Sequence, residues 1–400
     1  MGKPTIRFEG YTDDWEQRKL GDIYGLIGNA FVGTATPYYA EQGHFYLESN
    51  NVKDGQINHN SEVFINDEFY EKQKDKWLHT GDMVMVQSGH VGHAAVIPEE
   101  LDNTAAHALI MFRNPKEEIE PYFLNYEYQT DKAKKKIENI TTGNTIKHIL
   151  SSDMQEFVVD VPKYEEQKVI AGYFSNIDNL ITLHQRKCEE TKKIKKFMLQ
   201  KMFPKKGEKV PEIRFDGFTD DWEQRKFGDA FKEYSEKNHI ELPALTIIQG
   251  GGTIKREESD RNLMYDKANL SNYKMVQKDD FIVHLRSFEG GLEKSSLDGI
   301  ISPAYHTFHS NEADSRFYYP YFRSHEFIKH KLVPHVYGIR DGRSIDIDGM
   351  KTIEIPYPSM EEQRKIGDFL ECLDHLITLH QHKCKELQNI KKFMLQNMFI

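Results

Sequence analysis

The stretch from Glu165 to Phe203 carries apolar residues that recur every seven positions. Residues seven apart lie on the same face of an α-helix, and no proline interrupts the stretch, so the pattern predicts one long helix with a broad apolar stripe. At ~1.5 Å per residue, this helix is roughly 58 Å long. The stripe has three rows: Ile170, Ile177, His184, Thr191 and Met198; Tyr173, Leu180, Lys187, Ile194 and Lys201; Phe174, Ile181, Cys188, Lys195 and Met202.

The same stretch occurs again at the end of the chain. Glu361 to Phe399 repeats Glu165 to Phe203 at a constant offset of 361 − 165 = 196, with 23 of 39 positions identical. A lone helix of this length cannot bury its stripe, so each copy is the predicted partner of the other in a coiled coil. The residues predicted at the helix or subunit interface are Ile177, Leu180, Ile181, His184, Leu373, Leu376, Ile377 and His380.

A second repeat precedes the variable part of each half. Pro4 to Ile23 returns as Pro211 to Ala230 at an offset of 211 − 4 = 207, with 15 of 20 positions identical. Each half is therefore a shared leader, a variable segment and a shared helix. Two such half-units predict a nearly cyclic arrangement with an approximate two-fold axis, which offers two equivalent docking surfaces.

The variable segments indicate mixed α/β domains. Short runs rich in β-branched and aromatic residues, bounded by turn residues, predict strands within 43–52, 63–67, 82–89, 94–98, 156–162, 244–252, 281–288, 299–305 and 352–358. Helices are predicted at 120–140 and 317–332. The fold class is therefore α+β. The predicted parts are a first domain at 1–164 with its leader at 4–23, a helix at 165–203, a linker at 204–210, a second domain at 211–360 with its leader at 211–230, and a helix at 361–400.

Composition limits the partners and the compartment. The chain has 38% hydrophobic residues, three cysteines without a CxxC motif, no apolar run long enough for a membrane span and no signal-peptide core. These features favour the cytoplasm. The net charge of −10 argues against a chain that grips nucleic acid alone, because phosphate contacts need Lys and Arg. Locally, however, residues 165–203 carry 8 Lys or Arg against 5 Asp or Glu.

No catalytic constellation emerges from the motifs. Ser302-Pro303-Ala304-Tyr305 lacks the second proline of an adenine-amino methyltransferase motif and is interpreted as a strand end. The glycines at 250–252 lack the Lys-Ser/Thr of a P-loop and predict a turn. His184 with Cys188, and His380 with Cys384, have helical spacing that suits a metal, but their equivalent heptad positions favour an interface.

Polar loops of the variable domains are the better candidates for contact with DNA. Arg suits bidentate contact with guanine, and Asn or Gln suits contact with adenine. The candidates are Gln87, Ser88, His90, Thr142, Asn144, Thr145, Lys147 and His148 in the first domain, and His284, Arg286, Ser287, Arg340, Arg343 and Ser344 in the second.

The complete arrangement resembles the specificity subunit of type I restriction-modification systems. The resemblance covers essentially all of the chain. It rests on the Pro-x-x-Glu-Glu-Gln motifs at 162–167 and 358–363, the helix signatures Ile177–Ile181 and Leu373–Ile377, and the Asp-Trp-Glu-x-Arg-Lys leaders at 14–19 and 221–226.

The resemblance implies a division of labour within a larger complex. Each variable domain would be a target recognition domain that reads one half of a split site in double-stranded DNA. The long helices would pair antiparallel, set the spacer and dock two methyltransferase subunits, and two restriction motor-nuclease subunits would join them. S-adenosylmethionine, ATP and Mg²⁺ would act in those partners, with no cofactor or metal on this chain. Two alternatives stay open: a coiled-coil scaffold that never touches DNA, and a self-contained DNA adenine methyltransferase.

Overall fold

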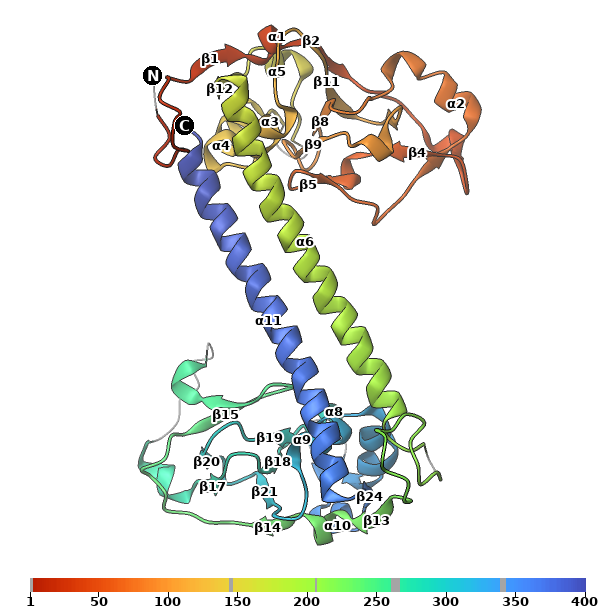
Figure 1. The fold of residues 1–400 in the computed structure, drawn as a ribbon, viewed down its shortest axis with the longest axis vertical. Helices are drawn as coiled ribbons and strands as arrows, with labels where there is room; N and C mark the ends of the chain where they lie inside the picture. The colour runs from red at the N-terminus through yellow and green to blue at the C-terminus, as the bar shows by residue number, and fades with distance from the viewer. Residues whose placement is uncertain (1–2, 144–146, 206, 260–266, 339–342) are drawn as a thin grey trace. The chain divides into compact units, whose positions relative to one another are not determined.

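The structure is a computed structural model that describes residues 3–143, 147–205, 207–259, 267–338 and 343–400. The chain divides into two compact units, Met1–His184 with His382–Ile400, and Gln185–Gln381. The division falls inside both long helices, α6 (Tyr164–Lys201) and α11 (Met360–Met398), which are drawn in green and blue in Figure 1. Each unit therefore contains one variable domain and one half of each helix, whereas the sequence placed the boundaries at the helix ends.

The first unit is built on an antiparallel sheet in the order β2-β11-β8-β9. Its strands are Tyr24–Asn29, Leu109–Pro115, Met83–Val86 and Ala94–Val96. Side chains alternate between its faces. Met83 and Met85 pack into a cluster with residues of α3 (Pro121–Glu127) and α6, whereas Val84 and Val86 pack into a second cluster. Both faces are covered, so every residue of β8 is buried.

A smaller sheet in the order β10-β4-β7-β3 contributes to the second face of the first unit. Its strands are Ala105–Ala106, His44–Leu47, Phe64–Ile65 and Tyr39–Ala40. Two further pairs are β1 (Glu16–Lys19) with β12 (Val158–Val161) and β5 (Val52–Lys53) with β6 (Gln56–Ile57). The remaining helices are α1 (Leu20–Ile23), α2 (Asp67–Glu71), α4 (Asp131–Ile140) and α5 (Ser151–Gln155), with 3-10 turns at Thr36–Tyr38, Ser49–Asn51, Lys74–Lys76 and Glu99–Leu101.

The second unit has a sheet of the same order, β14-β21-β18-β19. Its strands are Lys232–Tyr234, His306–His309, Phe281–Val283 and Glu293–Lys294. Four strand pairs surround it: β13 (Glu223–Lys226) with β24 (Glu354–Tyr357), β15 (Leu245–Ile248) with β16 (Gly252–Lys255), β17 (Lys274–Val276) with β20 (Gly299–Ile301), and β22 (Val336–Tyr337) with β23 (Ser344–Ile345).

Helices of the second unit pack mainly against one face of its sheet through a large aromatic cluster. They are α7 (Phe227–Ala230), α8 (Ser287–Gly290), α9 (Ser315–Phe322), a π-helical segment (Glu326–Leu332) and α10 (Ile347–Lys351), with 3-10 turns at Arg256–Glu258, Lys267–Asn272 and Val333–His335.

The long helices pair antiparallel within each unit. In the first unit, Lys391 Nζ lies 2.7 Å from Asp178 Oδ1, and Cys384 Sγ lies 3.7 Å from the carbonyl oxygen of Ile181. Residue numbers thus fall along α11 as they rise along α6. In the second unit, the repeat supplies the equivalent contacts: Lys195 pairs with Asp374, and Cys188 Sγ lies 3.9 Å from the carbonyl oxygen of Ile377. The structure thus confirms the predicted pairing.

Two of the three predicted rows face the opposite helix, and the middle row does not. Ile177, Ile181 and Leu373 are buried, and Ile377, His184 and His380 are half-buried. In contrast, Leu180 and Leu376 are 44% and 36% exposed. These two leucines therefore lie outside the helix–helix interface, because two helices bury only the rows between them, and the predicted contact with another subunit stays a prediction.

The Glu-Glu-Gln motif ties the leader to the helix start. Its second residue is a buried carboxylate: Glu166 accepts two hydrogen bonds of 2.7 Å from Arg7 of the leader, and Glu362 accepts 2.6 and 2.8 Å bonds from Arg214. The glutamine of each motif is also buried. Gln167 Nε2 donates to the carbonyl of Pro162 at 2.8 Å, and its Oε1 accepts the amide of Glu120, which caps α3.

The end of each long helix meets a leader. Ile6 donates its amide to the carbonyl of Asn397 at 2.9 Å in the first unit, where the leader and the end of α11 lie side by side (Figure 1). In the second unit, Ile213 makes the same 2.9 Å bond to Lys201. The nearly cyclic order predicted from the two repeats is therefore observed in the backbone hydrogen bonds.

Both predicted domain helices are interrupted. The helix expected at 120–140 is divided into α3 and α4, because Thr130 Oγ1 accepts the amide of Ala133 at 3.1 Å and caps a new helix. The helix expected at 317–332 ends at Phe322 and resumes as the π-helical segment, where Ser324 Oγ accepts the amide of Phe327 at 3.2 Å. Serine and threonine favour such helix starts. These hydroxyls override the apolar periodicity.

Candidate nucleic-acid interface

In the first unit, the predicted contact residues come from two loops that lie side by side. The amide of Ile149 donates to the carbonyl of Gln87 at 2.9 Å, and the amide of Gly89 donates to the carbonyl of Lys147 at 3.2 Å. His148 exchanges backbone hydrogen bonds of 2.8 and 2.9 Å with Thr142. The loop after β8 and the loop after α4 thus present one continuous polar edge, which holds Gln87, Ser88, His90, Thr142, Lys147 and His148.

The second unit brings the equivalent loops together through side chains. The guanidinium of Arg343 lies 4.4 Å from the ring centroid of Phe288, and its Nη2 lies 3.3 Å from Glu289 Oε1. Phe288 and Glu289 belong to α8, directly after Arg286. A cation over an aromatic ring and beside a carboxylate is held in orientation. Arg286 and Arg343 are both exposed, as contact with DNA requires.

Two predicted residues of this loop are unsuited to a direct charge contact. Ser287 is fully buried, and its Oγ accepts the amide of His284 at 2.9 Å, so the hydroxyl shapes the loop. Burial lowers the pKa of His284 below its ordinary value near 6.5, so its imidazole is neutral at pH 7. Ser287 is therefore corrected to a structural residue. Asn144, Thr145 and Arg340 lie outside the described residues, and Ser344 is half-buried in β23.

Large exposed apolar residues stand among the charged ones in the second unit, and the sequence analysis missed them. Leu285 is 61% exposed and directly precedes Arg286, and Tyr337 is 60% exposed and pairs with Ser344 across the β22–β23 ladder. Apolar side chains recognise the thymine methyl group in the major groove. Leu285 lay within the strand predicted at 281–288, and Tyr337 lay beside loop residues that were selected only for polar side chains.

Each unit has a cleft between its recognition domain and the C-terminal part of one long helix. The first-unit cleft, of about 700 Å³, lies between the loop at 89–93, α4 and the end of α11. His90 and Lys147 line it, together with Lys391 and Lys392, which the loop analysis did not select. The second-unit cleft, of about 900 Å³, lies between α9, the residues that follow it and the end of α6. Lys195 and Lys196 line it at the positions equivalent to Lys391 and Lys392.

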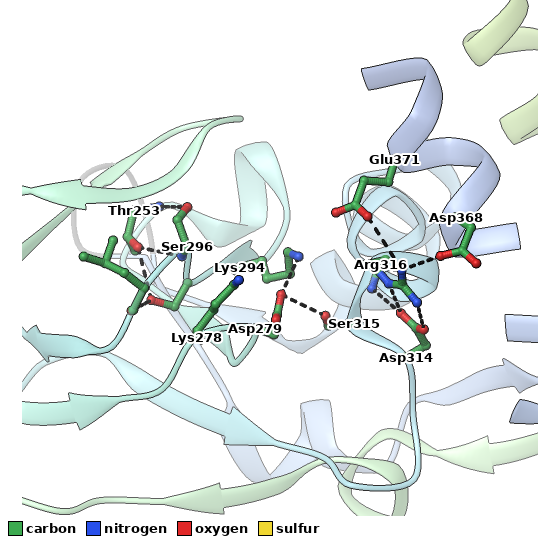
Figure 2. Close-up of polar contacts among 12 residues, drawn as sticks. Thr253, Lys278, Asp279, Lys294, Ser296, Asp314, Ser315, Arg316, Asp368 and Glu371 are labelled. Carbon is green, nitrogen blue, oxygen red and sulfur yellow. Dashed lines mark hydrogen bonds and ion pairs between the residues drawn. The ribbon is translucent and has the colours of Figure 1, made fainter. Parts of the chain in front are cut away.

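Ion pairs connect helix α9 of the second unit to α11 (Figure 2). Arg316 of α9 lies 2.7 Å from Asp314 Oδ2, contacts Asp368 and lies 3.6 Å from Glu371. On the neighbouring strand, Lys294 Nζ lies 2.6 Å from Asp279 Oδ1. Arg316 thus connects α9 to α11, and Ser315 Oγ of α9 donates to Asp279 Oδ1 at 3.4 Å.

The motifs that suggested chemistry have structural roles. Ser302 begins a turn in which the amide of Tyr305 donates to its carbonyl at 3.1 Å. The amides of Gly250 and Gly252 both donate to the buried carboxylate of Glu293, at 2.8 and 3.2 Å, so they are occupied. Among the residues that the structure describes, no group of three or more His, Cys, Asp or Glu side chains is arranged to hold a metal ion.

No helix in the described part of the chain has both the length and the apolar character needed to cross a membrane.

Comparisons with known proteins agree on one family. The model of the type I restriction modification DNA specificity domain matches residues 12–193 and, a second time, residues 219–389. The putative type I restriction enzyme MjaX specificity subunit of Methanocaldococcus jannaschii is 26% identical over 400 residues, covering 95% of this chain and 91% of the relative. The type I restriction enzyme MjaVIII specificity subunit of the same organism is 25% identical over 407 residues, with the same two coverages of 95% and 91%.

The fold has a solved counterpart as well. The crystal structure of the S subunit of a type I restriction-modification system from M. genitalium aligns with a TM-score of 0.62 at 15% identity, covering 100% of this chain and 99% of that one. The α+β fold with two recognition domains and two paired helices is thus shared with a known protein. Because the family model matches both halves and most of the chain, the protein belongs to the type I restriction-modification DNA specificity family, as a specificity subunit with two recognition domains.

Proposed function

We propose that each recognition domain reads one half of a bipartite site in double-stranded DNA, and that this chain chooses the site without performing chemistry. One observation carries the proposal: equivalent loops on equivalent sheets present different side chains. The loop after β8 carries the half-buried Gln87 and Ser88, and the loop after β18 carries the exposed Leu285 and Arg286. Glutamine suits adenine and arginine suits guanine. Two domains that share a sheet but differ in their loop residues fit a DNA site whose two halves have different sequences.

The long helices support a fixed spacer between the half-sites. Helix α6 has 38 residues, about 57 Å at ~1.5 Å per residue. Successive major-groove faces of B-DNA recur every ~34–36 Å. A helix of this length is longer than one such repeat, which fits two half-sites with unread bases between them.

Methylation sequencing of cells that carry this chain and its cognate methyltransferase subunit tests the proposal. The expected result is modified adenines in one asymmetric, bipartite sequence with half-sites about one helical turn apart. The purified chain alone should neither methylate nor cut DNA. A single short continuous site, or methylation by the isolated chain, would contradict the proposal.

Exposed apolar residues on the helices support docking of two methyltransferase subunits. In the first unit, Leu180, Ile390 and Phe393 are exposed, and in the second the equivalent residues Leu376, Ile194 and Phe197 are exposed. Contiguous exposed apolar surface marks interaction sites. Because the repeat duplicates the set, one kind of partner fits twice.

Charge substitution tests the docking surfaces. Leu180→Glu with Leu376→Glu should abolish co-purification with the methyltransferase subunit, because both carboxylates would be desolvated in the interface. Thr182→Glu with Thr378→Glu adds the same charges at exposed helix positions outside the set and should leave assembly intact. Assembly of the leucine variant at wild-type strength would rule out this surface.

The remaining partners and cofactors belong to the same proposal. S-adenosylmethionine would be bound by the methyltransferase subunits, and ATP and Mg²⁺ by two restriction motor-nuclease subunits. The cytoplasm, where these partners meet DNA, is the expected location.

A further inference from the structure

One lysine occupies the same place in both clefts. Lys196 lines the second-unit cleft and Lys392 lines the first-unit cleft, and they are related by the repeat offset of 392 − 196 = 196. Both side chains are exposed. Neither forms an ion pair with the residues that the structure describes. The sequence Ile-Lys-Lys-Phe is identical at 194–197 and 390–393, so both half-units retain the lysine although their domains differ.

The neighbouring lysines are already neutralised. Lys195 pairs with Asp374, and Lys391 pairs with Asp178, in the antiparallel helix contacts. Lys192 pairs with Glu189 at 2.6 Å. The charge of Lys196, next to these pairs, is therefore available to an external anion.

Lysines are numerous along the second-unit cleft, but most of their charges are balanced. Five lysines line it, at positions 192, 195, 196, 201 and 205. Lys201 and Lys205 both pair with Glu212, as Lys192 and Lys195 pair with Glu189 and Asp374. Among the described lysines of this cleft, Lys196 therefore offers the unbalanced positive charge that attracts a polyanion. In the first unit the cleft is mixed in charge, but it is continuous with the recognition loops through His90 and Lys147.

The lysine face differs from the apolar docking face of the same helix. Lys192, Lys195, Lys196 and Leu199 follow the spacing i, i+3, i+4 and i+7, so they share one helix face, and all four line the cleft. The helical spacing places Ile194 and Phe197, of the proposed methyltransferase surface, on the opposite face of the helix. The helix thus separates a basic face beside the recognition domain from an apolar face for a protein partner.

We infer that Lys196 and Lys392 contact the sugar–phosphate backbone of DNA next to the half-site that the adjoining domain reads. The inference rests on the proposed function. Clefts of this volume are too small for a duplex, so one backbone strand would cross the rim of each. A lysine ammonium binds phosphate as a point charge and carries no sequence information. These residues would therefore strengthen binding equally on every sequence.

The salt dependence of DNA binding by the reconstituted complex of this chain with its methyltransferase subunits tests the inference. Lys196→Gln and Lys392→Gln should each weaken binding severalfold on cognate and non-cognate duplexes alike. Each should lower the slope of log K against log salt by about 1, and the double variant by about 2. Lys196→Arg and Lys392→Arg keep the charge and should keep the slope.

Matched controls use exposed lysines of the same helices that line neither cleft. Lys193→Gln on α6 and Lys385→Gln on α11 remove the same charge and should leave the slope unchanged. The inference would be overturned if the Lys196 and Lys392 variants kept the wild-type slope, or if the control variants lost as much slope. Either result would leave site-specific methylation, and thus the proposed function, intact. A changed methylation sequence would also overturn it, because the lysines would then read bases. Failure of the proposed function would appear separately, as a wild-type complex without a bipartite site.

Discussion

The two half-units share a frame and differ in what the frame carries. Both have a four-stranded sheet of the same order and a leader pair with the last strand, β1 with β12 and β13 with β24. The first unit adds the small sheet that contains β4, whereas the second adds the β15–β16 hairpin and a π-helical segment. The shared leaders contact the long helices in both units, through Arg7 with Glu166 and Arg214 with Glu362. Residues of the variable segments contact these helices as well, as Arg316 does with Asp368.

Small differences inside the frame show where the copies are not equivalent. In the second unit, Trp222 Nε1 donates to Glu362 at 3.1 Å, in addition to the two bonds from Arg214. In the first unit, Trp15 Nε1 is buried without a hydrogen-bond partner in the structure. Glu166 therefore depends more heavily on Arg7 than Glu362 depends on Arg214.

The largest effect should come from breaking these anchors. Arg7→Ala leaves Glu166, whose side chain is 2% exposed, as an unpaired buried carboxylate, which costs about 3–5 kcal/mol. Arg214→Ala should cost about 1 kcal/mol less, because the indole of Trp222 still donates one hydrogen bond. Hydrogen exchange resolved along the full chain would measure the loss in each unit.

The control for these two Arg–Glu pairs keeps the positive charge and removes the second hydrogen bond of the guanidinium. Arg7→Lys and Arg214→Lys should recover part of the lost protection, because lysine makes one hydrogen bond where arginine makes two. Equal losses in Arg7→Ala and Arg214→Ala would show that the indole contact contributes nothing. Loss of protection in both units from one substitution would contradict independent anchoring.

A smaller effect concerns a carboxyl group that only the first unit has. Burial raises the pKa of Glu127 to about 8 from an ordinary value of 4.5. Counting from the helix caps Glu120 and Asp314, the second unit has Tyr321 at this position. The folded state retains a proton that the unfolded state releases, so stability is full below pH 4.5 and falls as the pH rises toward 8.

Substitution of Glu127 tests this pH dependence. Glu127→Gln removes the ionisable group and should stabilise the first unit at pH 7–8 by about 3–4 kcal/mol, with little change at pH 4. Thermal unfolding followed across this pH range measures the difference. Glu118→Gln, at an exposed position, should change nothing. If Glu127→Gln gave the same shift at every pH, the stabilisation would not come from ionisation.

The repeats made most of the fold predictable. When each of two paired helices has three apolar rows, two rows of each can be buried between the helices. The leaders are nearly identical, so their equivalent residues Arg7 and Arg214 are expected to contact equivalent partners. The broken helices escaped prediction because a single hydroxyl, as at Thr130 or Ser324, redirects the backbone against the apolar pattern. Tertiary capping of this kind is invisible to periodicity.

The candidate site was only partly predictable, for a related reason. Residue type selected Gln87 and Arg343, which the structure places on the loops, but it also selected Ser287, which is buried. The cleft residue Lys392 lies far from the loops in sequence and joins them only through folding. Contacts of this kind follow from packing.

The central claim is that one domain reads one half-site, and exchange of a single domain tests it most directly. Residues 24–160 would be replaced by the corresponding segment of another specificity subunit, and methylated adenines would be sequenced in cells that supply the cognate methyltransferase subunit. The account predicts that one half of the site changes, while the other half and the spacer length stay the same. A site that stays unchanged, or one in which both halves change, would contradict it.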